Sequence, residues 1–195
     1  MYEDDYIISL KEKMKYIDDK ELFGLIDKLI NERDYLINFS RIDPLSGLYN
    51  RNILNYIREC SCLVLCDIDN FKLVNDRYGH INGDMVIKEV ANILRNNFRI
   101  KDYVCRYGGY EFLIGVVQCE KDIVLDRLDN IQKEVCNNSI LSDMGVTLSI
   151  GVAFSYENDK LNDLIERADI ALYQSKLLGK NEICVYDDMM KRNLK

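Results

Sequence analysis

An apolar stripe at helical spacing occupies the N-terminal part of the chain. Segment 18–40 begins with Asp18 and Glu21, a capping-box-like spacing, and then repeats apolar residues three and four positions apart. The residues of the stripe are Leu22, Leu25, Ile26, Leu29 and Leu36. A shorter helical pattern precedes it at about residues 4–16, so the sequence predicts a helical arm over residues 1–40. The stripe either packs on the chain's own main domain or pairs two copies as a dimerising stalk.

The main domain is predicted over residues 41–190 and opens with a turn around the only proline, Pro44, in "RIDPLSGLYNR". After a short helix, apolar runs of strand length alternate with segments of helical period. The strands are "SCLVLCDID", the hairpin "YVCRYGGYEFLIGVVQ", "VTLSIGVAFS" and "EICVYD". The helices are "GDMVIKEVANILRNNF", a segment within 120–137, and "LNDLIERADIALYQSKLLG". This order predicts an α+β fold, with a mostly antiparallel sheet covered by helices on one or both faces.

Composition narrows the class of protein. The chain has 195 residues, of which 48% are hydrophobic, so it can bury one good core. A formal net charge of −7 argues against binding to nucleic acid polymers, which requires a basic face. The start "MYEDDYIISL" does not resemble a signal peptide, and no apolar run approaches the length of a membrane span. We therefore expect a cytoplasmic protein without direct membrane insertion.

Cysteine and histidine usage excludes some kinds of site. The seven cysteines are scattered, mostly in apolar runs and without C-x-x-C spacing, which favours reduced, buried thiols over disulfides or zinc. His80 is the only histidine, which excludes a histidine-based catalytic triad and a multi-histidine metal site.

Two acidic residues end the strand run "SCLVLCDID". Asp67 and Asp69 are two positions apart, so their side chains project to the same face. Carboxylate and carbonyl oxygens suit Mg²⁺, which usually keeps water ligands and is completed by substrate phosphates. If this strand lies beside the hairpin, Glu111 meets Asp67 across the strand ends, as in a nucleotide-polymerising palm. The alternative is that Asp67 and Asp69 only cap the turn that follows.

The stretch "CRYGGYEF", residues 105–112, predicts a hairpin tip at Gly108 and Gly109. Glycine enters the positive-φ turns of tight hairpins without steric cost. The tip therefore presents Tyr110 and Glu111 to solvent or to a ligand. Because successive strand residues point to opposite faces, Glu111 cannot take the position of Tyr110 without a local rearrangement.

Four motifs in this order resemble the GGDEF domains, which are diguanylate cyclases. They are "DPLSGLYNR", "DIDNFKLVNDRYGHINGD", "RYGGYEF" and "ADIALYQSKLLGKN", spread from Asp43 to about Asp187. The resemblance implies a palm-like sheet of the nucleotidyl-cyclase type, with mostly antiparallel strands and flanking helices. It also implies that two GTP molecules, each held by one subunit of a homodimer, condense into cyclic dimeric GMP with release of pyrophosphate.

The resemblance further implies a metal site and a base site. Asp67, the Ile68 carbonyl and Glu111 would hold Mg²⁺ or Mn²⁺ in a loop that also reads the base. Asn75 and Asp84 would bind the guanine edge, whose donors and acceptor they can match. A plainer interpretation of Asn75 and Asp84 as turn and helix-cap residues stays open.

The phosphates would be held by lysines. The resemblance implies this role for Lys72, Lys176 and Lys180, and Lys180 stands where the family usually has an arginine. Lysine keeps the charge but loses the bidentate fork of arginine. Lys176 is alternatively a solvated charge at the end of a helix.

The segment "GGYEF" departs from the family's GGDEF signature at its third position, Tyr110. In active members this third position is acidic, a metal ligand thought also to help deprotonate the attacking 3′-hydroxyl. A phenol, with a pKa of about 10, is neutral at pH 7 and replaces a carboxylate poorly at a hard cation. Glu111, one position on, is the surviving acid. We expect cyclase activity to be much reduced.

The segment "RIKD" resembles the family's R-x-x-D product-inhibition site. Arg99 would bind a phosphate or a guanine edge of cyclic dimeric GMP, and Asp102 would accept from the same base. A plain solvated pair at a helix end matches the four letters equally well.

Three functional hypotheses follow. The first is an impaired GGDEF domain that binds GTP, cyclic dimeric GMP or both. The second is an active diguanylate cyclase that relies on Asp67 and Glu111. The third is a dimerising scaffold that binds no nucleotide, with the helical arm as its functional part.

Overall fold

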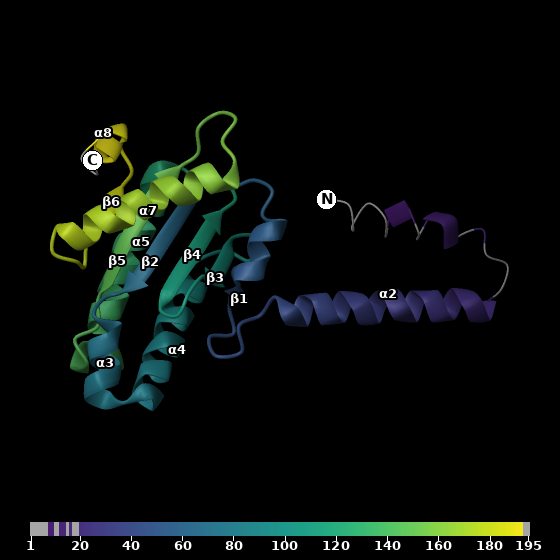
Figure 1. The fold of residues 1–195 in the computed structure, drawn as a ribbon, viewed down its shortest axis with the longest axis horizontal. Coiled ribbons are helices and arrows are strands. Elements are labelled where there is room, and N and C mark those ends of the chain that lie inside the picture. The colour runs from purple at the N-terminus through teal and green to yellow at the C-terminus, as the bar shows by residue number, and fades with distance from the viewer. Residues whose placement is uncertain (1–7, 10–11, 15, 17–19, 193–195) are drawn as a thin grey trace. The chain divides into compact units, whose positions relative to one another are not determined.

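The computed structural model describes residues 8–9, 12–14, 16 and 20–192. The chain divides into two compact units, residues 1–41 and 42–195. The first unit contains helix α2, Lys20–Ser40, which confirms a helix across most of the predicted segment (Figure 1). Asp18 and most of the shorter helical pattern lie outside the described residues. Among the stripe residues, Leu25 is 56% exposed and Leu29 is 64% exposed.

A single six-stranded sheet forms the centre of the second unit, in the order β1-β3-β4-β2-β5-β6. The strands are β1 Tyr49–Asn50, β2 Cys62–Ile68, β3 Tyr103–Arg106, β4 Glu111–Val116, β5 Leu148–Phe154 and β6 Ile183–Val185. The pairs β3–β4, β4–β2 and β2–β5 are antiparallel, whereas the edge pairs β1–β3 and β5–β6 are parallel. The prediction of a mostly antiparallel sheet is confirmed.

Helices cover both faces of this sheet (Figure 1). They are α3 Phe71–Tyr78, α4 His80–Asn97, α5 Lys121–Asn137, α6 Ser139–Asp143, α7 Leu161–Leu177 and α8 Asp188–Arg192, with a 3-10 turn at Arg51–Tyr56. The expectation of a loop over residues 67–84 and of a helix beginning at Gly83 is wrong, because α3 and the start of α4 form a helical hairpin there. The short elements β1, α6 and α8 were not predicted.

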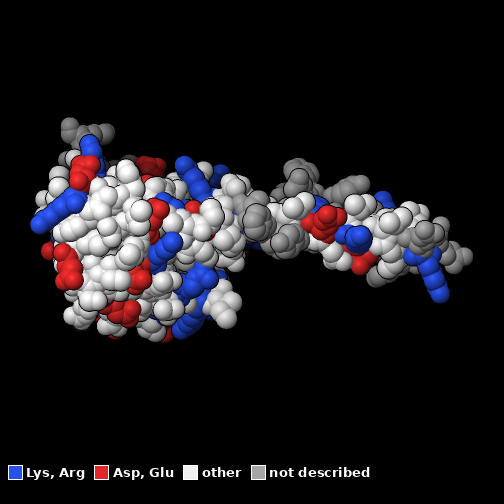
Figure 2. Space-filling view, turned by 90° about the horizontal axis from the view of Figure 1, so that it is seen from below, with Lys and Arg blue, Asp and Glu red and all other residues white. Residues whose placement is uncertain are grey.

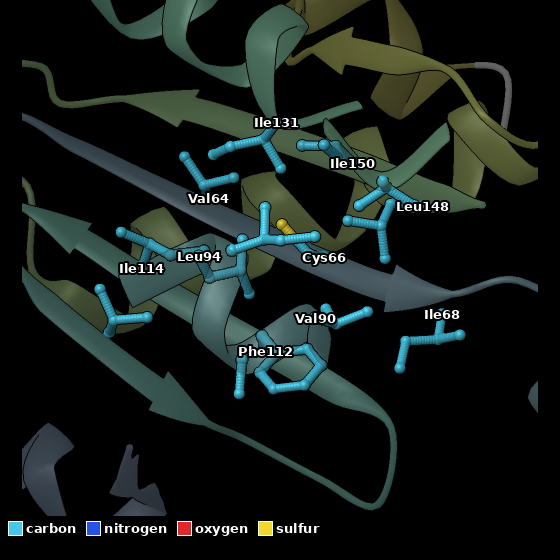
Figure 3. Packing of buried hydrophobic residues seen from close by; sticks show 14 of the residues in the cluster. Val64, Cys66, Ile68, Val90, Leu94, Phe112, Ile114, Ile131, Leu148 and Ile150 are labelled. Carbon is cyan, nitrogen blue, oxygen red and sulfur yellow. The ribbon is translucent and has the colours of Figure 1, made fainter. Parts of the chain in front are cut away.

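The side chains of β2 alternate between two hydrophobic cores, one on each face of the sheet. Val64 and Cys66 face α4 and α5, where Val90, Leu94 and Ile131 complete the larger core (Figure 3). Leu63 and Leu65 face α7 and pack in the smaller core with Leu164, Ala168 and Leu172. Since strand side chains alternate, Asp67 continues the α7 side and Ile68 continues the other. The end of β2 therefore presents a carboxylate toward α7.

The cysteines mostly fill these cores. Cys62, Cys66, Cys105 and Cys184 are buried, and all seven are free thiols. Burial raises the pKa of the Cys60 thiol to about 11 and that of Cys105 to about 12. The expectation of buried thiols is wrong for Cys136, which is exposed on α5.

Candidate functional site at the ends of β2 and β4

Two carboxylates and an ammonium group meet where β2 ends and β4 begins. Asp67 is the direct cross-strand partner of Glu111, so the meeting of these acids expected from the sequence is confirmed. Lys176, in the last turn of α7, places its Nζ 2.7 Å from Oδ2 of Asp67. The Asp67 side chain is 6% exposed and that of Lys176 35%. Lys176 is therefore an ion-pair partner of the strand end and not merely a solvated helix-end charge.

Burial raises the pKa of Asp67, and the Lys176 ammonium offsets part of this effect. Asp69 raises it further, while Lys180 lowers it. Two lysines thus favour the ionised carboxylate in a largely desolvated place. An anionic ligand such as a phosphate would find both cations at the same strand end.

The donor set at this strand end fits a hard cation only in part. Asp67 and Glu111 supply two carboxylates, and carboxylate oxygens are the ligands that Mg²⁺ prefers. Within the described part of the chain, no group of three or more His, Cys, Asp and Glu residues is placed to hold a metal. A cation here would therefore need further oxygens from the backbone, water or ligand phosphates, which is usual for Mg²⁺.

Asp69 has a structural role. Its Oδ1 accepts a hydrogen bond from Ser149 Oγ at 2.6 Å, and its Oδ2 accepts bonds from Thr147 Oγ1 at 2.7 Å and from the Asn181 amide at 3.0 Å. The residue is 2% exposed. These donors come from β5, from Thr147 just before it and from the α7–β6 loop, so the carboxylate connects the end of β2 to both of these segments. The idea that Asp69 shares a cation with Asp67 is not supported, since protein donors already occupy both of its oxygens.

Lys180 lies in the α7–β6 loop, where the backbone is strained. Gly179, Lys180 and Asn181 all have positive φ, at 122°, 68° and 52°. The Lys180 ammonium donates to Asn70 Oδ1 at 2.6 Å. Left-handed conformations at non-glycine residues cost energy and persist where surrounding contacts fix them. The loop thereby directs Lys180 toward the end of β2, whereas Lys72 lies exposed on α3.

The α3–α4 hairpin brings Asn75 against Gly83. A Cβ atom at Gly83 would lie 1.9 Å from Asn75 Oδ1, so only glycine leaves room for this amide. Asn75 Oδ1 is buried and has no hydrogen-bond partner among the described residues. Asp84 follows Gly83 and is exposed. Asn75 lies within α3 and Asp84 within α4, so neither is a helix cap. An unsatisfied buried amide oxygen is a feature that a ligand donor would complete.

Tyr110 and Glu111 at the hairpin tip point to different sides. The ring of Tyr110 stacks on Phe71 of α3, with ring centroids 5.4 Å apart. Glu111 instead lines a cavity of about 290 Å³ against α7, together with Asp169, Tyr173 and Lys176. Glu111 therefore does not replace Tyr110, as expected from strand alternation.

The two glycines of the tip do not act as predicted. Neither Gly108 nor Gly109 has a positive φ, so the expectation of a positive-φ turn is wrong. A Cβ at Gly108 would lie 2.4 Å from Glu111 Oε2, so a side chain there would displace the carboxylate end of Glu111. Asp169 and Tyr173 were not among the residues predicted for the site. Their spacing from Lys176, seven and three positions along one helix, could have identified them.

The predicted product-inhibition residues lie elsewhere in the unit. Asp102 is 5% exposed, and its carboxylate accepts hydrogen bonds from the amides of Arg99 at 3.0 Å and Val117 at 3.2 Å. Arg127 lies 3.7 Å from the same carboxylate. The interpretation of Arg99 and Asp102 as a solvated pair is therefore wrong, because Asp102 is buried and closes a turn. Arg99 is exposed and lines a cavity of about 320 Å³ with Arg95, Phe98 and Tyr49 among others.

Comparison with known proteins agrees with this arrangement. The family described as "Diguanylate cyclase, GGDEF domain" matches residues 40–182. Diguanylate cyclase A of Treponema denticola is 37% identical over 143 residues, which is 71% of this chain and 38% of that protein. Diguanylate cyclase DgcZ of Escherichia coli is 35% identical over 180 residues, covering 86% of this chain and 60% of that protein. The chain thus spans less than two thirds of the length of these curated relatives.

A solved structure shows the same fold. The coiled coil and GGDEF domain of DgcB from Caulobacter crescentus, in complex with c-di-GMP, superposes with a TM-score of 0.75 at 28% identity. The match covers 91% of this chain and 99% of that one. The family match spans most of the second unit, including the strand ends, both helices of the α3–α4 hairpin and α7. The chain therefore belongs to the GGDEF family of diguanylate cyclase domains.

Proposed function

We propose that this chain is a guanine-nucleotide-binding domain of cyclic dimeric GMP signalling whose cyclase turnover is reduced. The observation that carries the proposal is the strand end itself. Asp67, Glu111 and Lys176 converge there, while Tyr110 turns away to stack on Phe71. The binding groups are present, and the acid at the third signature position is not.

Each group has a part in binding GTP. Asp67, the Ile68 carbonyl and Glu111 would hold Mg²⁺ or Mn²⁺. When bound, this cation would neutralise part of the negative charge of the phosphates. Asn75 and Asp84 would read the guanine edge, since an amide and a carboxylate match its O6 acceptor and its N1 and N2 donors.

The lysines would hold the phosphates. Lys176 and Lys180 both act on the Asp67 carboxylate, so they lie where a triphosphate bound beside it would place its charge. Lys72 on α3 would add a third contact. A phosphate would draw Lys176 away from Asp67 and free that carboxylate for a cation.

Turnover would be slow because of the residue at position 110. The attacking hydroxyl requires a base, and the Tyr110 ring, stacked on Phe71, does not supply the carboxylate that active members have there. Glu111 is ionisable but faces α7. We therefore expect reduced cyclase activity. The alternative is an active cyclase, which the presence of both Asp67 and Glu111 favours.

Product formation from two GTP molecules requires two such domains. The exposed leucines of α2 are suited to pairing with a second copy, and the similar DgcB structure contains a coiled coil next to its GGDEF domain. We therefore propose a homodimer. A purely scaffolding function would apply if the dimer bound no guanine nucleotide.

None of the helices in the part of the chain that the structure describes is long and apolar enough to cross a membrane. Acidic and basic side chains both occur on the face shown in Figure 2.

Asp67→Asn tests the nucleotide site directly. Removing the charge should weaken GTP binding in Mg²⁺ about tenfold, since a carboxylate ligand is lost, and should leave binding in EDTA nearly unchanged. Isothermal titration with GTP and ATP measures this, with chromatography of the products in parallel. Asp129→Asn, on the exposed face of α5, is the matched control. Equal loss of affinity in Mg²⁺ and EDTA would contradict the metal role, and no GTP binding by the native chain would refute the proposal.

Arg99→Ala tests a separate product site. The exposed guanidinium should bind a phosphate of cyclic dimeric GMP, so its removal should weaken that ligand about tenfold and leave GTP affinity unchanged. Asp102 is less suited to ligand binding because backbone amides already engage it. Titration of both ligands into the two proteins measures the effect. A parallel fall in both affinities would show that the two sites are not separate.

A further inference from the structure

We infer that Tyr110 is a positioning residue for the base pocket: its ring, stacked on Phe71, fixes the wall formed by α3 and α4. This rests on the proposed binding of a guanine nucleotide at Asn75. It gives the substituted signature position a role of its own, beyond the loss of an acid.

The contact between Tyr110 and α3 is well defined. The rings lie 5.4 Å apart at an interplanar angle of 29°, within the range of favourable aromatic pairs. Phe71 is the first residue of α3 and is 8% exposed. Tyr110 is 42% exposed, and its carbonyl accepts a hydrogen bond from the Ile68 amide at 3.2 Å. The backbone of residue 110 is thus anchored to β2, and its ring covers the start of α3.

Phe71 in turn contacts the place where α3 and α4 meet. The Cβ position of Gly83 lies 3.2 Å from Phe71 Cζ and 1.9 Å from Asn75 Oδ1. The ring, the amide and the glycine therefore form one packed group. Asn75 Oδ1 has no hydrogen-bond partner among the described residues, so packing rather than hydrogen bonding sets its direction. Movement of Phe71 would redirect the amide that is proposed to read guanine.

An acidic side chain at position 110 could not supply this stack. A carboxylate has no aromatic face and is strongly hydrated, so it would leave open to solvent the face of Phe71 that the Tyr110 ring covers. Tyrosine at this position therefore orders the base pocket, whereas an acid would act as a metal ligand. The hydroxyl is not required for the stack, which makes phenylalanine a conservative replacement.

The test compares Tyr110→Ala and Tyr110→Phe with the native chain. Guanosine monophosphate is titrated in EDTA, so that neither a metal nor a triphosphate contributes. Loss of the ring should weaken guanosine monophosphate about fivefold and leave adenosine monophosphate unchanged, which lowers base selectivity. Tyr110→Phe should stay within about twofold of the native affinity. Tyr156→Ala, which removes a half-exposed ring from the loop before α7, is the control and should change nothing.

A measurement without ligand separates this inference from the proposed function. Amide hydrogen exchange across residues 71–83 should be faster in Tyr110→Ala than in the native chain and should be restored in Tyr110→Phe. Unchanged exchange, or equal effects of alanine and phenylalanine, would overturn the positioning role. If the native chain bound no guanosine monophosphate or GTP, the proposed function would fail, and the exchange result would still decide whether Tyr110 orders α3.

Discussion

Replacing Gly151 by alanine is expected to lower the free energy of unfolding by about 3 kcal/mol, because the added methyl group has no space. A Cβ at Gly151 would lie 2.2 Å from the Ala168 carbonyl oxygen and 2.3 Å from the Leu172 amide nitrogen. Both are backbone atoms of α7, which cannot yield as the end of a flexible side chain would. Gly151 does not have a positive φ, so glycine is needed there for close approach alone. The helix must therefore move away from the sheet or the strand must bend.

Gly115→Ala is the matched control for this prediction. Gly115 also lies in a central strand, but a Cβ there would meet Ile57 Cδ1 at an ordinary 3.5 Å. We expect that change to alter stability by less than about 1 kcal/mol. Urea unfolding followed by circular dichroism measures both variants. Equal stabilities of the two would show that α7 can be displaced without cost.

The packing at Gly151 also concerns the candidate site. Helix α7 carries Lys176, Tyr173 and Asp169 to the cavity beside Glu111. A shift of the helix at Gly151 would move the Lys176 ammonium relative to Asp67. We therefore expect Gly151→Ala to weaken GTP binding even at temperatures where the variant stays folded.

Continuous apolar runs of strand length were sufficient to predict the centre of the sheet. The run that became β2 ends in acidic residues, and the Gly-Gly pair marks the turn of the hairpin that became β3 and β4, which together place Asp67 beside Glu111. Helix α3 was missed because, in its eight residues, only Phe71 and Val74 are buried. So short a helix gives little periodic signal, and its position depends on packing against α4.

Contacts between distant parts of the chain could not be predicted from the sequence. The partners of Asp69 are Thr147, Ser149 and Asn181, at separations of 78, 80 and 112 residues. No local pattern indicates which strand will supply such donors. The stack of Tyr110 on Phe71 joins two motifs in the same way. Sequence reasoning could establish that position 110 had lost an acid, but not what its ring would contact.

Tyr110→Glu is expected to raise the rate of cyclic dimeric GMP formation about 100-fold, the size of effect typical of a restored general base. The Tyr110 carbonyl bonds to the Ile68 amide, so residue 110 sits beside the end of the strand that carries Asp67. A carboxylate there could both receive the proton of the attacking hydroxyl and face a bound cation. Product formation from GTP in Mg²⁺, followed by chromatography, measures the rate.

Tyr110→Gln separates the charge from the loss of the ring. It is close to glutamate in shape but carries no negative charge, so it should stay as slow as the native chain. Because both variants lose the stack on Phe71, both should also bind guanosine monophosphate more weakly in EDTA, by about fivefold. A glutamate variant with faster turnover and weaker metal-free binding would show that position 110 balances base-pocket order against acid–base chemistry. If glutamate left turnover unchanged, the defect would lie in another residue, and if glutamine raised it equally, the stack itself would be what slows the native domain.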